Sequence, residues 1–255
     1  MSKERTAKRF IGALLGESKA PLVALPEMWS GIPELPKMLV DLTGLSDEVY
    51  GKYAFSREIL RGKIDDTAKS ELTMRANECG REYAGRVLAT HGLIKGKPKI
   101  ADNLAAALGM KVSNPRVPTG TDHVTFAQFE APDKISIFQD GLDKAAELLK
   151  DDEVRHVLGG IEIREILLAH ELFHCVEQAF HKEIFTRTYK IELWAPWPLH
   201  NRSTVRCLSE IAGMAFAREL LGLRYSPFVL DVFLIYGYHP ALAGCLYQEI
   251  MEMND

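Results

Sequence analysis

The sequence predicts an α+β protein that is mostly helical and has a small antiparallel β-sheet. Two segments, residues 124–130 and 134–140, alternate apolar and polar side chains as β-strands do. The segments on either side of them read as helices, with apolar residues at helical spacing. With 255 residues, 47% of them hydrophobic, the chain is long enough to bury a sizeable core.

We expect the chain to divide near residue 70. Residues 1–70 are helical in character, but prolines between residues 21 and 36 break them into short pieces. Ser46 is placed to cap one of these pieces. No convincing helix-turn-helix pattern occurs there, so this region is a helical N-terminal extension of unknown role. Residues 71–255 form the main domain.

The first half of the main domain begins with a helix over residues 69–90. A short helix follows, with Asp102 or Asn103 near its N-terminus, and it ends at Gly109 before a strand. The two alternating segments then pair as a hairpin around residues 131–133, since Pro and Asp are turn formers. A further helix begins after this hairpin.

The second half is predicted to be helical. Gly159 and Gly160 break the chain before a helix over residues 161–183. An irregular, aromatic connection over residues 185–203 leads to a helix over residues 204–223, which we expect Ser203 or Thr204 to cap. Two more helices finish the chain, one ending near Gly237 and one starting after Pro240.

Composition narrows the classes of function. A net charge of -4 argues against an electrostatic nucleic-acid binder. The four cysteines form no C-x-x-C pair, which favours free thiols in a reducing compartment. Cys175 is expected to be a small core residue rather than a ligand. We find neither a signal peptide nor a long uninterrupted apolar segment, so we expect a soluble, cytoplasmic protein without a membrane partner.

The stretch ILLAHELFHCVEQ contains an H-E-x-x-H motif made of His170, Glu171 and His174. Residues four apart lie on one side of a helix, so both imidazoles can reach one metal ion. Zn²⁺ prefers such ligands and acidifies a bound water, while the offset Glu171 can take the proton as general base. Two imidazoles and one carboxylate suit zinc well.

Context decides whether this motif is accidental. A chain with eight histidines contains H-E-x-x-H by chance on the order of once in fifty chains. Here the motif lies in the middle of a predicted helix, follows an apolar segment, and precedes a helix that carries a further acid. The alternative is a helix whose histidines and glutamate form only hydrogen bonds and bind no metal.

Glu210 is the leading candidate for a third ligand. It stands in the first turns of an otherwise apolar helix, and the small residues at positions 212, 213 and 215 would let that helix approach the motif closely. The alternative reading is a glutamate favoured by the helix dipole. Glu219 is the alternative ligand. Glu177 and His181 lie further along the motif helix and are expected near the ligands or at the surface.

The aromatic connection contains groups that could contact a substrate. Tyr189 and His200 are candidates for donating a hydrogen bond to an oxyanion. The alternative is that Trp194, Trp197 and the neighbouring prolines simply pack this connection.

These segments resemble the ImmA/IrrE family of zinc metallopeptidases. The segments ADNLAAALGMKV, VTFAQFEAPDKISIF, REILLAHELFH and EIAGMAFARELL carry the resemblance, which covers residues 75–225. It implies a zincin-like core, with His170 and His174 as zinc ligands, Glu171 as general base and Glu210 as third ligand. Phe173 stands where the family usually has glycine. Residues 1–70 fall outside the resemblance.

The function predicted from these residues is that of a zinc-dependent metallopeptidase, a hydrolase that cleaves a protein or peptide substrate. Characterised members of the family cleave transcriptional repressors, so a regulatory protein is one candidate substrate, although the resemblance carries over no particular repressor target. The alternative is a non-catalytic zinc-binding regulatory protein that acts through partner binding, because Phe173 or the aromatic connection could fill the cleft.

Overall fold

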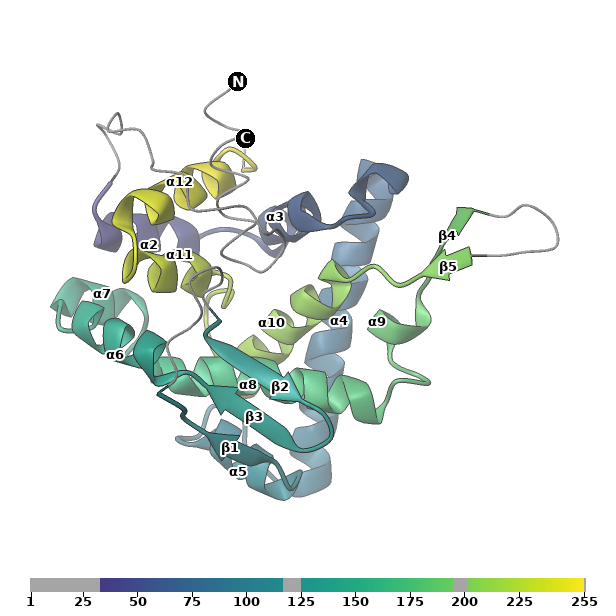
Figure 1. The fold of residues 1–255 in the computed structure, drawn as a ribbon, viewed down its shortest axis with the longest axis horizontal. Helices are drawn as coiled ribbons and strands as arrows, with labels where there is room; N and C mark the ends of the chain where they lie inside the picture. Colours follow the sequence, from purple (N-terminus) through teal and green to yellow (C-terminus); the bar gives the residue numbers. More distant parts are fainter. Residues whose placement is uncertain (1–32, 117–124, 195–200, 255) are drawn as a thin grey trace.

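The computed structural model describes residues 33–116, 125–194 and 201–254 (Figure 1). Over these residues it is mostly helical with a small mixed sheet, so the predicted α+β class is confirmed. The helices are α2 Leu35–Thr43, α3 Asp47–Arg57, the 3-10 turn η1 Arg61–Lys63, α4 Asp66–His91, α5 Ile100–Ala107, α6 Gln139–Leu148, α7 Asp152–Val157, α8 Ile163–Ala179, α9 Phe185–Thr188, α10 Cys207–Leu221, α11 Val229–Tyr236 and α12 Pro240–Met251.

Two small sheets accompany these helices. The first contains β1 Lys111–Ser113, β2 Ala127–Glu130 and β3 Lys134–Ile137 in the order β1-β3-β2. The second is the hairpin of β4 Ile191–Trp194 and β5 Asn201–Ser203. In the first sheet, β2 runs antiparallel to β3 and β1 runs parallel to it. The sheet is therefore mixed rather than purely antiparallel, because the strand predicted after Gly109 joins the hairpin.

Residues at its two ends explain where α4 begins and where it stops. The side chain of Asp65 accepts a hydrogen bond from the Ala68 N–H at 2.8 Å and caps the first turn. Gly92 ends the helix in the left-handed conformation, with φ of 64°. The helix predicted over residues 69–90 is thus confirmed and extends slightly at both ends.

The centre of the molecule is formed by α4, α8 and α10, with α10 packing against both α4 and α8 (Figure 1). A Cβ at Gly80 of α4 would lie 2.2 Å from the backbone oxygen of Ala212 on α10, so only glycine allows this approach. On its other side, α8 packs against β2 and β3. The motif helix is therefore held between helices and the sheet.

Helices α2 and α3 come from the predicted N-terminal extension. They pack against α4, α10, α11 and α12, and their buried side chains belong to the same hydrophobic core as those of α8 and α10. Ser46 caps α3 as expected, accepting a hydrogen bond from the Val49 N–H at 3.3 Å. Residues 1–32 of the extension lie outside the described part.

Two expectations about the chain after the motif are wrong. The described part of the connection is not irregular, because it forms α9 and the β4–β5 hairpin. Ser203 and Thr204 do not cap the next helix, since α10 begins at Cys207 and has no side-chain cap from its N-cap residue Arg206. The two final helices, α11 and α12, lie where they were predicted.

Within the described residues, no helix combines the length and the apolar character needed to cross a membrane.

Candidate metal centre

Helix α8 presents both motif histidines on the same side. Their rings lie with centroids 4.8 Å apart, and the two Nε2 atoms are separated by 3.1 Å. The helix is anchored by buried apolar residues before the motif, including Ile166 and Leu168. Because this face of α8 is packed, the two imidazoles are held at the edge of the core with 13% and 19% of their side chains exposed.

Helix α10 brings Glu210 to the same point. Its Oε2 lies 3.2 Å from His170 Nε2, and its Oε1 lies 3.8 Å from His174 Nε2. One ligand atom from each of the three residues lies within 4.8 Å of the others. The Glu210 side chain is 51% exposed, far more than either imidazole. The open side of the centre is therefore the side of Glu210.

The spacing of these atoms fits a tetrahedral zinc ion. Ligands about 2.0–2.1 Å from such an ion lie about 3.3 Å from one another. Here the two imidazole nitrogens are 3.1 Å apart, and the carboxylate of Glu210 offers Oε2 at 3.2 Å from His170 and Oε1 at 3.8 Å from His174, with one ligand atom of each residue within 4.8 Å of the others. Two imidazole lone pairs this close repel unless a proton or a cation lies between them. The donor set of two nitrogens and one carboxylate is one that Zn²⁺ accepts.

The charges around the site also favour a cation. Burial works to raise the pKa of Glu210, but the hydrogen bond from His170 and the charges of both histidines hold it at about 2. Because half of the Glu210 side chain is exposed, the effect of burial is reduced, and the two histidines decide the direction of the pKa shift. Burial lowers the pKa of His174, yet the carboxylates of Glu177, Glu210 and Glu171 outweigh it and raise the pKa to about 9.

A second layer of polar groups holds His174. Its Nδ1 lies 3.4 Å from Ser209 Oγ and 3.8 Å from Glu177 Oε2. Glu177 is fully buried, and it accepts a hydrogen bond from Thr186 at 2.5 Å and pairs with Arg187 at 2.7 Å. Such outer partners orient a ligating imidazole. Glu177 therefore lies beside the candidate ligands and is not one of them.

His170 is held by packing instead. A Cβ at Gly213 would lie 2.9 Å from its Cε1 and 3.0 Å from its Nδ1. The Nδ1 atom is buried and has no hydrogen-bond partner among the described residues. The small residues of α10 thus serve two contacts, because Gly213 meets α8 whereas Ala212 and Ala215 meet α4 at Gly80.

Glu171, the predicted general base, follows His170 on α8 and is 8% exposed. Glu219, the alternative ligand, is not part of the group and pairs with Lys95 at 2.6 Å. His181 is exposed, with its Nδ1 2.9 Å from the Gln178 carbonyl oxygen. The three groups that the structure brings together are those of His170, His174 and Glu210.

Of the two expected oxyanion donors, only Tyr189 lies within the described residues, and its described contacts are with other aromatic and basic groups. Tyr189 packs on the ring of Phe185, with centroids 5.5 Å apart, and beside the Arg75 guanidinium. His200 and Trp197 lie outside the described residues, and so does the side chain of Trp194. The four cysteines are free and buried, and Cys175 does not join the group of possible ligands.

Sequence reasoning missed several residues that stand near Glu210. A cavity of about 720 Å³ is lined by Glu210 together with Tyr53, Glu58 and Asp231, among others. The Tyr53 hydroxyl donates a hydrogen bond to Asp231 at 2.7 Å. These residues come from α3, from the turn after it and from α11. No local motif marks them, and the only signal in the sequence is that Asp231 is an acid within an apolar segment.

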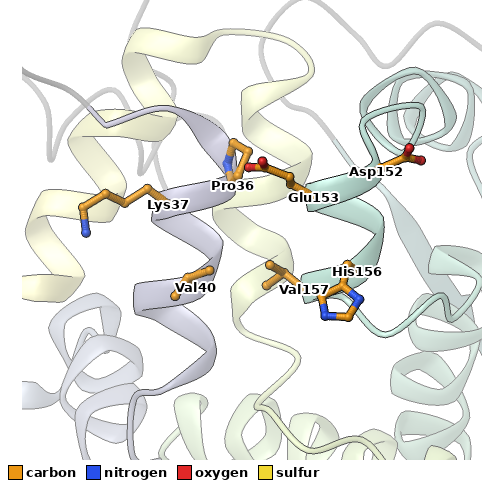
Figure 2. Close-up of a pocket in the computed structure, with 7 residues that line it drawn as sticks. All are labelled: Pro36, Lys37, Val40, Asp152, Glu153, His156 and Val157. Carbon is orange, nitrogen blue, oxygen red and sulfur yellow. The ribbon is translucent and has the colours of Figure 1, made fainter.

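A second cavity, of about 620 Å³, is unrelated to this centre. Figure 2 shows it between α2 and α7, with Lys37 and Val40 on one side and Glu153 and His156 on the other. None of the three candidate ligands lines it. We therefore place the candidate site where the middle of α8 meets the first turn of α10 at Glu210.

Comparisons of this chain with protein-family models, with curated proteins and with solved structures find no match.

Proposed function

We propose that this protein is a zinc-dependent metallopeptidase that hydrolyses a peptide bond in a protein or peptide substrate. One observation carries the proposal. The Nε2 atoms of His170 and His174 and the carboxylate of Glu210 converge within 4.8 Å, on two different helices. Glu171, the acid that follows the first histidine, completes the H-E-x-x-H arrangement of a metal-dependent hydrolase.

Each residue then has a defined role. His170, His174 and Glu210 would hold the ion, while Ser209 and Glu177 orient the His174 ring. A zinc ion bound there supplies Lewis acidity toward the scissile carbonyl and the attacking water. Glu171 accepts the proton of that water and delivers it to the leaving amine.

The sheet offers a place for the main chain of the substrate. Strand β2 stands at one edge of the three-stranded sheet and packs against α8. An extended peptide that paired with β2 would gain main-chain hydrogen bonds and would run alongside the motif helix. The mixed sheet beside the motif helix supports a zincin-like architecture and the proposed ImmA/IrrE-like character.

The position of Phe173 does not favour the non-catalytic alternative. Phe173 is fully buried, and its ring lies 5.7 Å from the ring of Phe216 on α10. It fills the core between α8 and α10 and does not occupy the open side at Glu210. Phe173 therefore gives no reason to expect a zinc-binding regulator without peptidase activity.

Metal content and cleavage test the proposal together. Untagged protein, Glu210→Ala and Glu171→Gln are purified without chelator, analysed for metal, and incubated with a mixed peptide library. We expect about one zinc per chain in the wild type and in Glu171→Gln, little in Glu210→Ala, and cleavage by the wild type alone.

Two results would contradict the proposal. Cleavage that survives Glu171→Gln would exclude the assigned general base. A wild type that neither contains nor takes up zinc would exclude the metal centre. Zinc binding without any cleavage would favour the regulatory alternative.

A further inference from the structure

The cavity beside Glu210 lies on the open side of the candidate metal centre. Its walls come from α3 and the turn after it, from the first turns of α10, and from the beginning of α11. Its volume of about 720 Å³ is within the range of small-ligand pockets, about 300–1,000 Å³. A substrate group in this cavity would lie next to Glu210.

One wall of the cavity is apolar. The rings of Tyr53 and Phe228 meet edge to face with centroids 5.6 Å apart, and Met214 lies on the same lining. Ile59 also lines the cavity and is 76% exposed. This wall can accommodate the methylene stem of a side chain.

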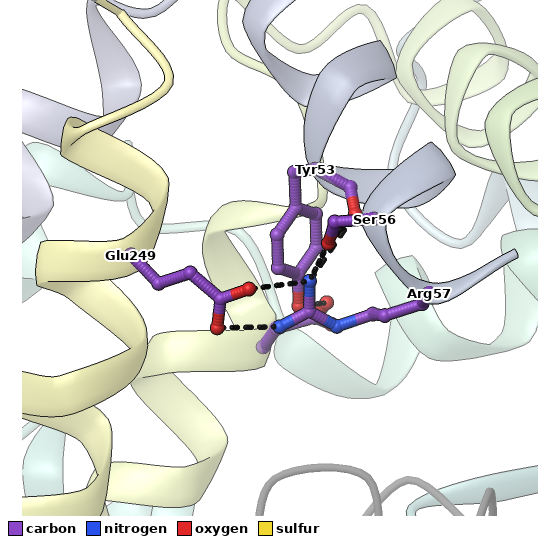
Figure 3. Close-up of polar contacts among 5 residues, drawn as sticks. Tyr53, Ser56, Arg57 and Glu249 are labelled. Carbon is purple, nitrogen blue, oxygen red and sulfur yellow. Dashed lines mark hydrogen bonds and ion pairs between the residues drawn. The ribbon is translucent and has the colours of Figure 1, made fainter. Parts of the chain in front are cut away.

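Several charged side chains that line the cavity already form ion pairs or hydrogen bonds with other groups of the protein. Figure 3 shows the Arg57 guanidinium facing the carboxylate of Glu249. The two groups form an ion pair with a nitrogen–oxygen distance of 3.2 Å. The guanidinium carbon of Arg57 also lies 3.8 Å from the centre of the Tyr53 ring. Glu58 is buried and accepts hydrogen bonds from the backbone N–H groups of Leu60 and Cys207. These charges are therefore already paired or hydrogen-bonded.

Two arginines on the lining differ from these groups. Arg61 and Arg206 are exposed, and neither forms an ion pair with a carboxylate among the described residues. Arg61 donates to the backbone oxygen of Glu58 at 3.0 Å. Two further acids line the cavity: Asp231 accepts the hydrogen bond from Tyr53, and Glu210 faces the imidazoles of His170 and His174. The lining charges that remain available to a ligand at the exposed part of the cavity are therefore the positive charges of Arg61 and Arg206.

We infer that this cavity binds an acidic side chain, aspartate or glutamate, of the peptide substrate, with Arg61 and Arg206 pairing with its carboxylate. Guanidinium groups suit this task because their planar donors match the two oxygens of a carboxylate. The inference rests on the proposed function, since it assigns a substrate class to the same site.

Binding can be measured separately from cleavage. The full chain with Glu171→Gln is loaded with zinc and titrated into fluorescein-labelled pools of random peptides with an amidated C-terminus. One pool has a fixed glutamate at its centre and the other a fixed glutamine. We expect the glutamate pool to bind about fivefold more tightly, because a partly exposed ion pair contributes that much.

Charge variants test whether Arg61 and Arg206 cause the tighter binding of the glutamate pool. Arg61→Gln with Arg206→Gln should remove it, and Arg61→Glu with Arg206→Glu should shift it toward a fixed-lysine pool. Lys97→Glu is the matched control, since Lys97 is an exposed cation that does not line the cavity. Zinc content and melting temperature are checked in every variant, so that a misfolded variant is recognised.

Each outcome decides the inference. Equal binding of the glutamate and glutamine pools, or a preference that survives both arginine changes, overturns it. A glutamine pool with a free C-terminus that binds as tightly as the glutamate pool also overturns it, because the ligand is then a terminal carboxylate. Arginine-dependent binding without wild-type cleavage supports the acid pocket and rejects the peptidase, whereas cleavage without acid preference does the reverse.

Discussion

The carboxylate of Glu58 accepts a hydrogen bond from the backbone N–H of Cys207 at 3.0 Å. Cys207 is the first residue of α10, so Glu58 provides the cap that the residues just before this helix do not. Its negative charge also lies at the positive end of the helix dipole. A residue from the N-terminal region therefore fixes the helix end that presents Glu210.

We expect Glu58→Ala to destabilise the protein and to weaken zinc binding. Losing a cap and leaving a buried N–H unsatisfied lowers the free energy of unfolding by about 1–2 kcal/mol. Urea unfolding and a zinc competition titration measure the two effects. Glu71→Ala, an exposed glutamate on α4, is the control. Unchanged zinc affinity in Glu58→Ala would show that the cap does not position Glu210.

Gly213→Ala tests the packing of His170. The added methyl would lie 2.9 Å from the ring, which forces the imidazole or α10 to move. We expect a loss of zinc affinity that isothermal titration detects. Gly85→Ala on α4 is the matched control, because a Cβ there meets nothing within 4 Å. If both variants bind zinc like the wild type, His170 does not depend on this close approach.

Arg187 is expected to stabilise the buried Glu177 carboxylate. Removing Arg187 leaves that charge with the Thr186 hydroxyl and the nearby His174, so Arg187→Ala should lower the free energy of unfolding by about 1–3 kcal/mol. Adding Glu177→Gln should recover part of this loss, since it removes the unpaired charge. Chemical denaturation of the single and double variants measures the coupling, and additive effects would contradict it.

Asp231 gives a pH dependence of stability. Burial raises its pKa from 3.8 to about 6, although the hydrogen bond from Tyr53 and the positive charge of Arg57 act against this shift. The folded protein holds this proton more tightly than the unfolded chain, so the stabilising contribution exists below pH 3.8 and is lost as pH rises through about 6. In metal-free protein, Asp231→Asn should gain about 1–3 kcal/mol over the wild type between pH 4 and pH 7.

Thermal or urea unfolding across this pH range measures the difference. The asparagine oxygen can still accept from Tyr53, which keeps the comparison close. A difference between the two proteins that does not change with pH would show that Asp231 titrates as an ordinary carboxyl group.

Local features made much of the fold predictable. The predicted cap at Ser46 acts within one turn of its helix. The approach of His170 and His174 follows from helix geometry, because residues four apart lie on one side. The helices around the motif could therefore be placed from the sequence.

Tertiary packing decided the rest. Glu210 and Glu219 stand on the same helix, and only the crossing of α8 and α10 at Gly213 determines that the first meets the histidines and the second pairs with Lys95. The cap at Glu58 and the cavity lined by Tyr53 join residues far apart in the chain. The sequence made Glu210 the leading candidate but left Glu219 as an alternative, because sequence patterns report neighbours along one element. The cap and the cavity depend on how separate elements pack, so they follow only from the folded structure.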